Sequence, residues 1–295
     1  MDAVVFEQWV QRALSDVEQA LDGFVPANAP AGLGEAMRYS VLGGGKRLRA
    51  LLVLAACEAV RGQHDPAMRS ACAVEMIHAY SLVHDDMPCM DDDVMRRGKP
   101  TTHVQFGEAQ AMLAGDAMQA LAFEVLTPET GVEPALQARL CALLARSAGH
   151  AGMAGGQAID LAMVGKQIDE CTLRDMHRRK TGQLLEASVL MGAACGQTDA
   201  KVWKELTAYG AALGLAFQVV DDILDVTQDS AVLGKTAGKD QDANKPTYVS
   251  IMGLDPARAL AQQLRDEAHA ALAASGLTDT ASLAMLADMV VERDN

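Results

Sequence analysis

The chain has 295 residues, 50% of them hydrophobic, and a formal net charge of −14. This length can supply a substantial core, and the acidic balance argues against nucleic acid, whose binding needs clustered Lys and Arg. No apolar run approaches the ~20 residues of a membrane-spanning helix, residues 1–7 lack the features of a secretory signal, and the six scattered cysteines form no Cys-x-x-Cys pair. We expect a soluble, cytoplasmic protein without a membrane span.

Helical periodicity runs through most of the chain. Aromatic residues are only 4% of the composition, and apolar residues recur at three- and four-residue spacing, as in Leu213, Phe217, Val220 and Leu224. We find no alternating strand runs with hairpin turns, no repeat and no low-complexity linker. The sequence therefore predicts one all-α domain over residues 1–295, with a glycine-containing turn at residues 152–156 and a long loop at residues 235–246.

A glycine-rich segment followed by cations occupies residues 43–49. Its sequence is Gly-Gly-Gly-Lys-Arg-Leu-Arg, with Lys46, Arg47 and Arg49 as the charged groups. A flexible backbone at the start of a helix, together with these cations, suits a diphosphate through charge-assisted hydrogen bonds. The Gly-x-x-x-x-Gly-Lys-Ser/Thr spacing of a Walker loop is absent, and no strand precedes the segment.

An aspartate cluster follows an apolar helical stretch. Its members are Asp85, Asp86, Asp91, Asp92 and Asp93. Like charges beside apolar residues need neutralisation, which a hard divalent cation with oxygen ligands provides. Asp85 and Asp91 would lie about 120° apart in an ideal helix, but Pro88 disturbs the turn. We expect the chain to leave the helix there and to bring Asp91 back toward Asp85.

Basic and histidine residues flank this cluster. An isolated Arg-Arg pair such as Arg96-Arg97 is most often surface charge, but beside a metal clamp guanidinium groups that bind phosphate oxygens become the better interpretation. His78 lies two helical turns before Asp85, on nearly the same face. Taken alone, it would more often be a hydrogen-bonded core histidine than a ligand, and we expect His84 to be structural.

A second aspartate cluster at residues 221–225 follows another apolar helical stretch. Residues four apart share a helix face, so Asp221 and Asp225 are expected to point the same way while Asp222 is rotated by about 100°. An isolated acidic run is usually a solvated helix end. Two clusters of related form, each directly after an apolar helix, instead favour a pair of metal-binding clamps.

These motifs, in this order, resemble those of the trans-isoprenyl diphosphate synthases from about residue 38 to residue 248. The matching segments are residues 44–49, 82–93, 96–101, 152–157, 180–182 and 217–225, followed by Gly234 and Lys235. Within the family the pattern is most similar to bacterial farnesyl diphosphate synthases. The resemblance implies a single large helical bundle of the isoprenoid synthase type with a central active-site cavity.

The resemblance also implies a reaction. An allylic diphosphate, dimethylallyl or geranyl, ionises, and the double bond of isopentenyl diphosphate attacks the resulting cation head to tail. Mg²⁺ would assist, with three ions expected and Mn²⁺ as a substitute, and the released diphosphate would take the final proton. The expected main product is farnesyl diphosphate, with geranylgeranyl diphosphate as the alternative, and the expected assembly is a homodimer.

Roles follow from the resemblance residue by residue. The implied metal ligands are Asp85, Asp86, Asp91, Asp221, Asp222 and Asp225. Isopentenyl diphosphate would be bound by Lys46, Arg49, His78 and Arg97. The allylic diphosphate would be bound by Arg96, Lys180, Thr181, Gln218, Lys235 and Lys245. The residues expected to act in catalysis are Asp85, Asp91, Arg96, Lys180, Thr181, Gln218 and Asp221.

Product length is expected to be set at Tyr80 and Ser81, five and four residues before Asp85. In the family, an aromatic residue there together with the Pro88-Cys89 enlargement of the first motif goes with a fifteen-carbon product. A packed core aromatic is the competing interpretation of Tyr80. One departure from the family is Ala50, which follows Arg49 where a proline is usual, so that the start of this helix is expected to be less rigid.

Three other functions fit the sequence less well. A terpene cyclase shares the first aspartate motif but has no second substrate for Lys46, Arg49 and His78. A non-catalytic subunit would be expected to have lost one of the clusters. A structural or cation-buffering helical protein would leave the basic residues without a role. The synthase is therefore the preferred hypothesis.

Overall fold

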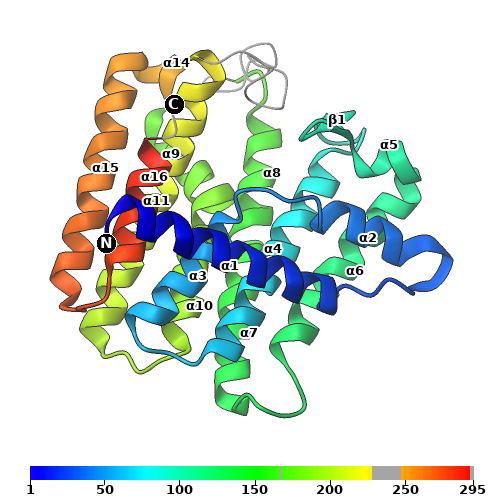
Figure 1. Cartoon of the computed structure of the whole chain (residues 1–295). Coiled ribbons are helices and arrows are strands. Elements are labelled where there is room, and N and C mark those ends of the chain that lie inside the picture. The colour runs from blue at the N-terminus through cyan, green and yellow to red at the C-terminus, as the bar shows by residue number, and fades with distance from the viewer. Residues whose placement is uncertain (167, 228–246, 293–295) are drawn as a thin grey trace.

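The computed structural model describes residues 1–166, 168–227 and 247–292, and it is almost entirely helical (Figure 1). The first half contains α1 (Ala3–Phe24), a short 3₁₀ turn (Pro30–Gly32), α2 (Leu33–Val41), α3 (Leu48–Ala59), α4 (His64–Asp85), β1 (Met95–Arg96), β2 (Lys99–Pro100), α5 (Thr102–Phe106), α6 (Glu108–Leu126) and α7 (Pro134–Ala148). The second half contains α8 (Met153–Met163), α9 (Glu170–His177), a π-helical segment (Arg178–Gly182), α10 (Gln183–Ala194), α11 (Ala200–Thr227), α14 (Tyr248–Met252), α15 (Leu254–Ser275) and α16 (Ala281–Val291).

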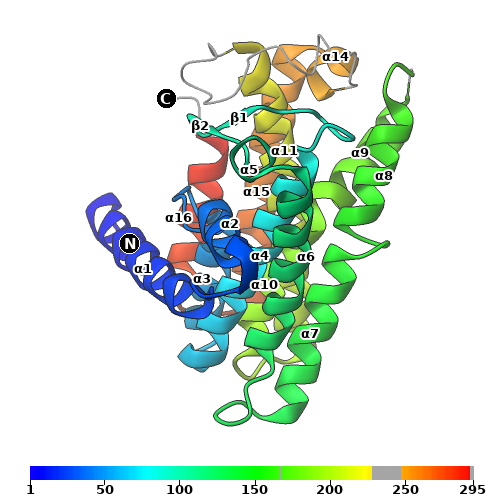
Figure 2. The same cartoon turned by 90° about the vertical axis from the view of Figure 1, so that its right-hand side faces the viewer.

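Two helices, α3 and α10, form the centre of the bundle. Every residue of α3 except Glu58 is buried, and α10 is buried from Leu184 to its end apart from Glu186. A helix that is apolar on all sides must be covered on all sides. The long helices α4 and α11 provide much of this cover, with α6 packed along α4 and α15 packed along α11 (Figures 1 and 2). The predicted all-α class is confirmed.

One small hairpin was not predicted. Strands β1 and β2 pair antiparallel, with Met95 opposite Pro100 and Arg96 opposite Lys99. The two turn residues, Arg97 and Gly98, have φ angles of 51° and 73°, as a type I′ turn requires. Strands of two residues are too short to show alternation, so the sequence pattern could not reveal them.

The helix boundaries also differ from expectation around the glycines. Gly152 precedes α8, but Gly155 and Gly156 lie inside that helix rather than in a turn. The π-helical segment between α9 and α10 was not predicted either. The predicted loop at residues 235–246 lies outside the described residues. Within the described parts of the chain, no helix is both long and apolar enough to cross a membrane.

Close packing of α10 on α3 depends on Gly192. A Cβ at this position would lie 2.1 Å from the carbonyl oxygen of Val53 and 3.0 Å from the Cβ of Ala56. We predict that Gly192→Ala lowers the free energy of unfolding by about 1–3 kcal/mol, because the two helices must separate. Urea denaturation measures this change.

The control is Gly23→Ala in α1, where an added Cβ meets nothing within 4 Å. Alanine is the better helix former, so this variant should be neutral or more stable by up to about 1 kcal/mol. Equal effects of the two substitutions would contradict the packing role of Gly192.

Candidate active site

The first aspartate cluster folds back on itself as predicted. Helix α4 ends at Asp85, and the backbone N–H of Asp91 donates to the Asp85 carbonyl oxygen at 2.9 Å. The N–H of Asp93 donates to the Asp86 carbonyl oxygen at 3.1 Å. These bonds close the loop that contains Pro88, so Asp91 lies beside the end of α4 rather than about 1.7 turns further along a helix.

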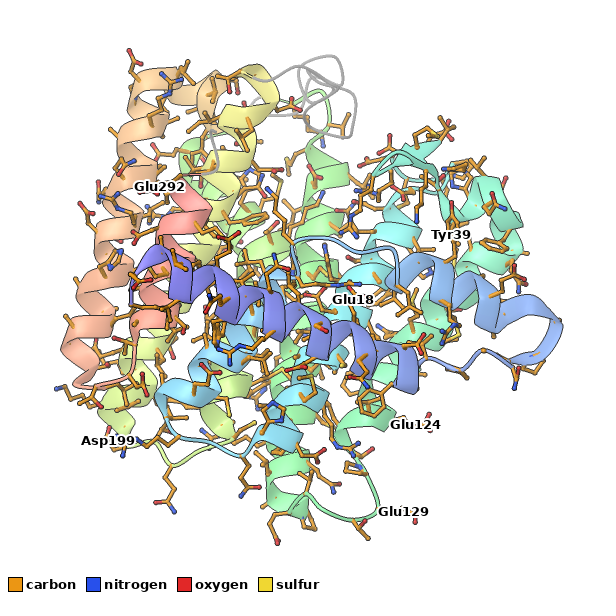
Figure 3. The ribbon with its side chains drawn as sticks, viewed as in Figure 1. Glu18, Tyr39, Glu124, Glu129, Asp199 and Glu292 are labelled. Atoms are coloured by element: carbon orange, nitrogen blue, oxygen red, sulfur yellow. The ribbon has the colours of Figure 1, made fainter. Side chains whose placement is uncertain are left out.

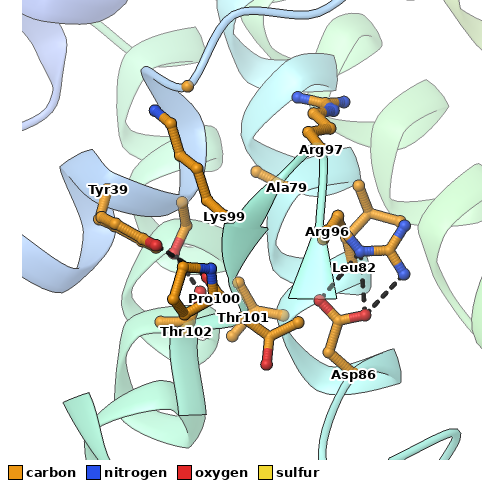
Figure 4. Close-up of a pocket in the computed structure, with 13 residues that line it drawn as sticks. Tyr39, Ala79, Leu82, Asp86, Arg96, Arg97, Lys99, Pro100, Thr101 and Thr102 are labelled. Carbon is orange, nitrogen blue, oxygen red and sulfur yellow. Dashed lines mark hydrogen bonds and ion pairs between the residues drawn. The ribbon is translucent and has the colours of Figure 1, made fainter. Parts of the chain in front are cut away.

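The two adjacent aspartates of this cluster have different partners. Gln157 of α8 donates its side-chain amide to Asp85. Asp86 is only 3% exposed and accepts from Arg96, whose Nε lies 2.9 Å from both carboxylate oxygens and whose Nη2 lies 2.6 Å from one (Figure 4). Desolvation works against the Arg96 charge, but the hydrogen bonds and the charge of Asp86 outweigh it and raise the pKa of Arg96. In this arrangement Asp86 positions Arg96, and its metal role stays a prediction.

The second aspartate cluster has a similar division. Helix α11 is unbroken from Ala200 to Thr227, so Asp221 and Asp225 lie one turn apart on one face, as expected. Asp222 is 2% exposed; it accepts from Gln218 Nε2 at 2.9 Å and from the backbone N–H of Tyr248 at 2.8 Å. Asp222 thus ties α11 to the start of α14, and its metal role stays a prediction.

Helix α8 and the π-helical segment link the two halves of the site. Lys180 forms an ion pair with Asp160 of α8 at 2.6 Å, and Thr181 donates to the amide oxygen of Gln218 at 3.1 Å. The π-helical turn, closed by the Gln183 N–H bond to the Arg178 carbonyl oxygen, places these adjacent side chains toward different helices. Such turns are frequent at functional sites.

Gln157 and Asp160 were missed as site residues. They lie three residues apart on α8, so they share a face, and one contacts the first cluster while the other contacts Lys180. Gln157 ended a segment that matched the family, but no physical role followed from a lone amide. The available signal was its Gln-x-x-Asp spacing, which places two polar groups on one side of an otherwise apolar helix.

The basic residues gather from three segments. Arg97 donates to the Gly44 carbonyl oxygen at 2.6 Å, and a Cβ on Gly45, whose φ is 129°, would lie 2.9 Å from the Arg97 guanidinium. Burial holds the pKa of His78 well below its usual value, and the nearby charges of Arg49 and Arg97 lower it further. Arg49 and Arg97 therefore lie near the neutral His78 imidazole, and the role of Lys46 beside them stays a prediction.

Tyr80 lies at the contact between α4 and α6. Its half-buried ring is edge-on to His84, with ring centroids 5.6 Å apart. The Nε2 atom of His84 lies 3.1 Å from the Met112 carbonyl oxygen of α6, in line with the structural role expected for His84. Ser81 instead donates to the His78 carbonyl oxygen of its own helix at 2.8 Å. Tyr80 is the bulkier of the two residues expected to set product length, and that role stays a prediction.

The carboxylates suit a metal that arrives with a diphosphate. Within the described residues, no three His, Cys, Asp or Glu side chains converge into a ready-made metal site. Mg²⁺ is usually held by one or two carboxylates, waters and substrate phosphates. The oxygen donors of Asp85 and Asp91 on one side and Asp221 on the other fit that mode of binding. Lys235 and Lys245 lie outside the described residues.

Comparison with known proteins gives consistent matches. The polyprenyl synthetase family model matches residues 30–277. A chloroplastic heterodimeric geranylgeranyl pyrophosphate synthase large subunit 1 from Arabidopsis thaliana is 47% identical, over 95% of this chain and 77% of its own. An FPP/GFPP synthase from Zymomonas mobilis has a similar structure, with a TM-score of 0.88, 39% identity and coverage of 98% and 100% of the two chains. A geranyltransferase from Helicobacter pylori, complexed with magnesium and isoprenyl diphosphate, has a TM-score of 0.84 at 33% identity, covering 97% and 96%.

The two possible roles of Asp86 have opposite effects on stability. If Asp86 positions Arg96, then Asp86→Asn removes a buried, charge-assisted pair and should lower the free energy of unfolding by about 1.5–3 kcal/mol. If Asp86 were mainly a metal ligand, its removal from metal-free protein would relieve repulsion among the carboxylates and raise stability. We predict the loss, measured by urea denaturation in the presence of a chelator.

Asp92→Asn serves as the matched control for this measurement. Asp92 is exposed and has a φ of 50°, a conformation that asparagine tolerates. Its substitution should change stability by no more than about 0.5 kcal/mol. A more stable Asp86→Asn protein beside an unchanged control would contradict the positioning role of Asp86.

Proposed function

Because this chain belongs to the polyprenyl synthetase family and is a head-to-tail prenyltransferase, we propose that it condenses isopentenyl diphosphate with dimethylallyl and geranyl diphosphates. The observation that supports this best is the shared face of α8. Its Gln157 contacts Asp85 of the first aspartate cluster, and its Asp160 holds Lys180 beside the second. An allylic diphosphate lying between the clusters would thus meet carboxylates, bound metal and fixed cations together.

Ionisation of the allylic diphosphate is assigned to this side of the site. Breaking the carbon–oxygen bond concentrates negative charge on the leaving diphosphate, and groups that are already in place stabilise that charge more than they stabilise the ground state. Arg96 and Lys180 are held for this purpose by Asp86 and Asp160. Mg²⁺, held by Asp85, Asp91 and Asp221, would supply Lewis-acid stabilisation of the same charge.

Attack by isopentenyl diphosphate is assigned to the cationic group on the other side. Lys46, Arg49 and Arg97 would hold its diphosphate, and neutral His78 would add a hydrogen bond without further charge repulsion. The alkene is a weak nucleophile, so the gain lies in holding it against the allylic carbon and excluding water. The hydroxyl of Thr181 and the amide of Gln218, bonded to each other, are assigned to the cation that forms between the substrates.

Two products remain as candidates. The names of the curated plant relatives, at 45–47% identity, support geranylgeranyl diphosphate over the farnesyl diphosphate expected from the sequence. Farnesyl diphosphate is the second candidate, supported by the Tyr80 ring on α4, which would stop a growing chain early, and by the name of the Zymomonas mobilis relative. The product of the purified protein decides between them.

Three further features stay proposals. We propose Mg²⁺ as the natural ion, supported by the magnesium complex of the Helicobacter pylori relative. We propose self-association as a homodimer, although the Arabidopsis thaliana relative is named as a heterodimer subunit. A single catalytic domain over residues 1–295 in the cytoplasm completes the proposal.

The reaction itself is tested with purified protein, labelled isopentenyl diphosphate and each allylic primer in turn. We predict prenyl diphosphate products that require Mg²⁺, are lost with chelator and return when Mg²⁺ is restored. Chromatography of the products distinguishes fifteen from twenty carbons. No product with any primer would support a non-catalytic subunit, and a cyclised hydrocarbon would support a terpene cyclase.

The role of Tyr80 is tested by changing its size. We predict that Tyr80→Ala shifts the products to longer chains than those of the unmodified protein, because the tail can extend past the missing ring. Tyr80→Phe keeps the ring and should leave the distribution unchanged. If Tyr80→Ala gives the same chain lengths as Tyr80→Phe, then Tyr80 is a packing residue and does not limit the product.

A further inference from the structure

Glu75 is a buried carboxylate in the middle of α4 without an assigned role. It is 2% exposed, and its two oxygens have different partners. Oε2 lies 3.3 Å from Nη1 of Arg47, and Oε1 accepts the backbone N–H of Ala50 at 3.1 Å. Both partners belong to the short segment that starts α3. A single side chain of α4 therefore holds the beginning of a different helix.

Arg47 differs from its basic neighbours because its side chain points into the protein. It is 6% exposed, and its Nη2 lies 2.7 Å from Oε1 of Glu18 on α1 and donates to the Val41 carbonyl oxygen at 2.5 Å. Glu18 is on α1 where that helix crosses the front of the bundle (Figure 3). Because these bonds and Glu75 occupy the guanidinium, Arg47 anchors the segment between Lys46 and Arg49.

The backbone of this segment needs such an anchor. Arg47 has a φ of 45°, a left-handed conformation that a residue with a large side chain adopts only when its surroundings hold it there. The N–H of Ala50, the third residue of α3, has no carbonyl partner within its own helix. A proline here would fix φ and remove the N–H; with alanine, Glu75 supplies the acceptor.

We propose that Glu75 is a positioning residue for isopentenyl diphosphate. By holding Arg47 and the Ala50 N–H, it sets the direction in which Lys46 and Arg49 leave the backbone. His78 lies one turn further along α4, on the same face, so the helix that carries the anchor also carries a predicted ligand. This inference rests on the proposed function, and it extends that function to a residue that touches neither substrate.

The location of Glu75 predicts a selective effect. Its partners, Arg47 and Ala50, are the sequence neighbours of Lys46 and Arg49. Arg96 and Lys180, on the allylic side, are instead held by Asp86 and Asp160. Loss of Glu75 should therefore weaken the use of isopentenyl diphosphate and spare the allylic substrate. A carboxylate that served only general stability would change both substrates alike or neither.

The experiment measures KM for each substrate separately with Mg²⁺ present. For Glu75→Ala we expect KM for isopentenyl diphosphate to rise about tenfold or more, because small displacements of binding groups have effects of this size. KM for geranyl diphosphate should stay within about twofold. Glu75→Gln keeps the shape and an oxygen for the Ala50 N–H but loses the charge that faces Arg47, so it should show a smaller rise of the same selectivity. If Glu75→Ala does not fold, Glu75→Gln carries the test.

Glu58→Gln is the matched control. Glu58 lies near the other end of α3 and accepts Trp9 Nε1 with both oxygens, at 3.0 and 2.9 Å, so it joins α3 to α1 without reaching the basic segment. Both KM values should be unchanged in this variant. Parallel rises in both KM values, or a lower melting temperature with unchanged KM values, would overturn the proposal. An unmodified protein without prenyl transfer would instead refute the proposed function.

Discussion

Pairing of buried charges determines the arrangement of this site. Its carboxylates follow helices built largely from alanine, leucine, valine and methionine, where an ionised group without a partner is strongly unfavourable. Three buried acids have a donor from another element: Asp86 has Arg96 of the hairpin, Asp160 has Lys180 of the π-helical turn, and Glu75 has Arg47 before α3. These pairs join different elements of the fold and fix the positions of Arg96, Lys180 and Arg47.

The two aspartate clusters follow one rule despite their different backbones. In each cluster the second aspartate is buried and accepts hydrogen bonds from the protein. Asp86 accepts from Arg96, and Asp222 accepts from Gln218 and from the Tyr248 N–H. The first aspartates, Asp85 and Asp221, are both half-buried. Adjacent residues on a helix differ by about 100° in direction. One of two neighbouring aspartates can therefore hydrogen-bond within the protein while the other points toward a ligand. In each Asp-Asp pair the buried member is therefore held by the protein, while the half-buried member is the one predicted to bind metal.

Much of the fold and part of the site were predictable from residue patterns. Helical periodicity predicted the all-α class, and Pro88 predicted the return of Asp91 to Asp85, because proline removes a donor that the helix needs. The hairpin at β1 and β2 and the π-helical turn at Lys180 were not predictable, since each depends on a few residues held by tertiary contacts. For the same reason the roles of Gln157, Asp160 and Glu75 emerged only from the structure: an amide or carboxylate on a helix does not reveal which distant group it will meet.

The departure at Ala50 shows how such contacts change the meaning of a substitution. From the sequence, alanine in place of the usual proline suggests a less rigid start to α3. In the structure the Ala50 N–H is bonded to Glu75, which also holds Arg47, so a hydrogen bond restrains the turn that a proline ring would restrain covalently. A proline ring would restrain the turn without contacting another helix. The hydrogen bond from Ala50 instead connects the turn to α4, the helix that also carries His78, Tyr80 and Asp85. Helix α4 thus carries His78, Tyr80 and Asp85 and, through Glu75, also restrains the segment that contains Lys46 and Arg49.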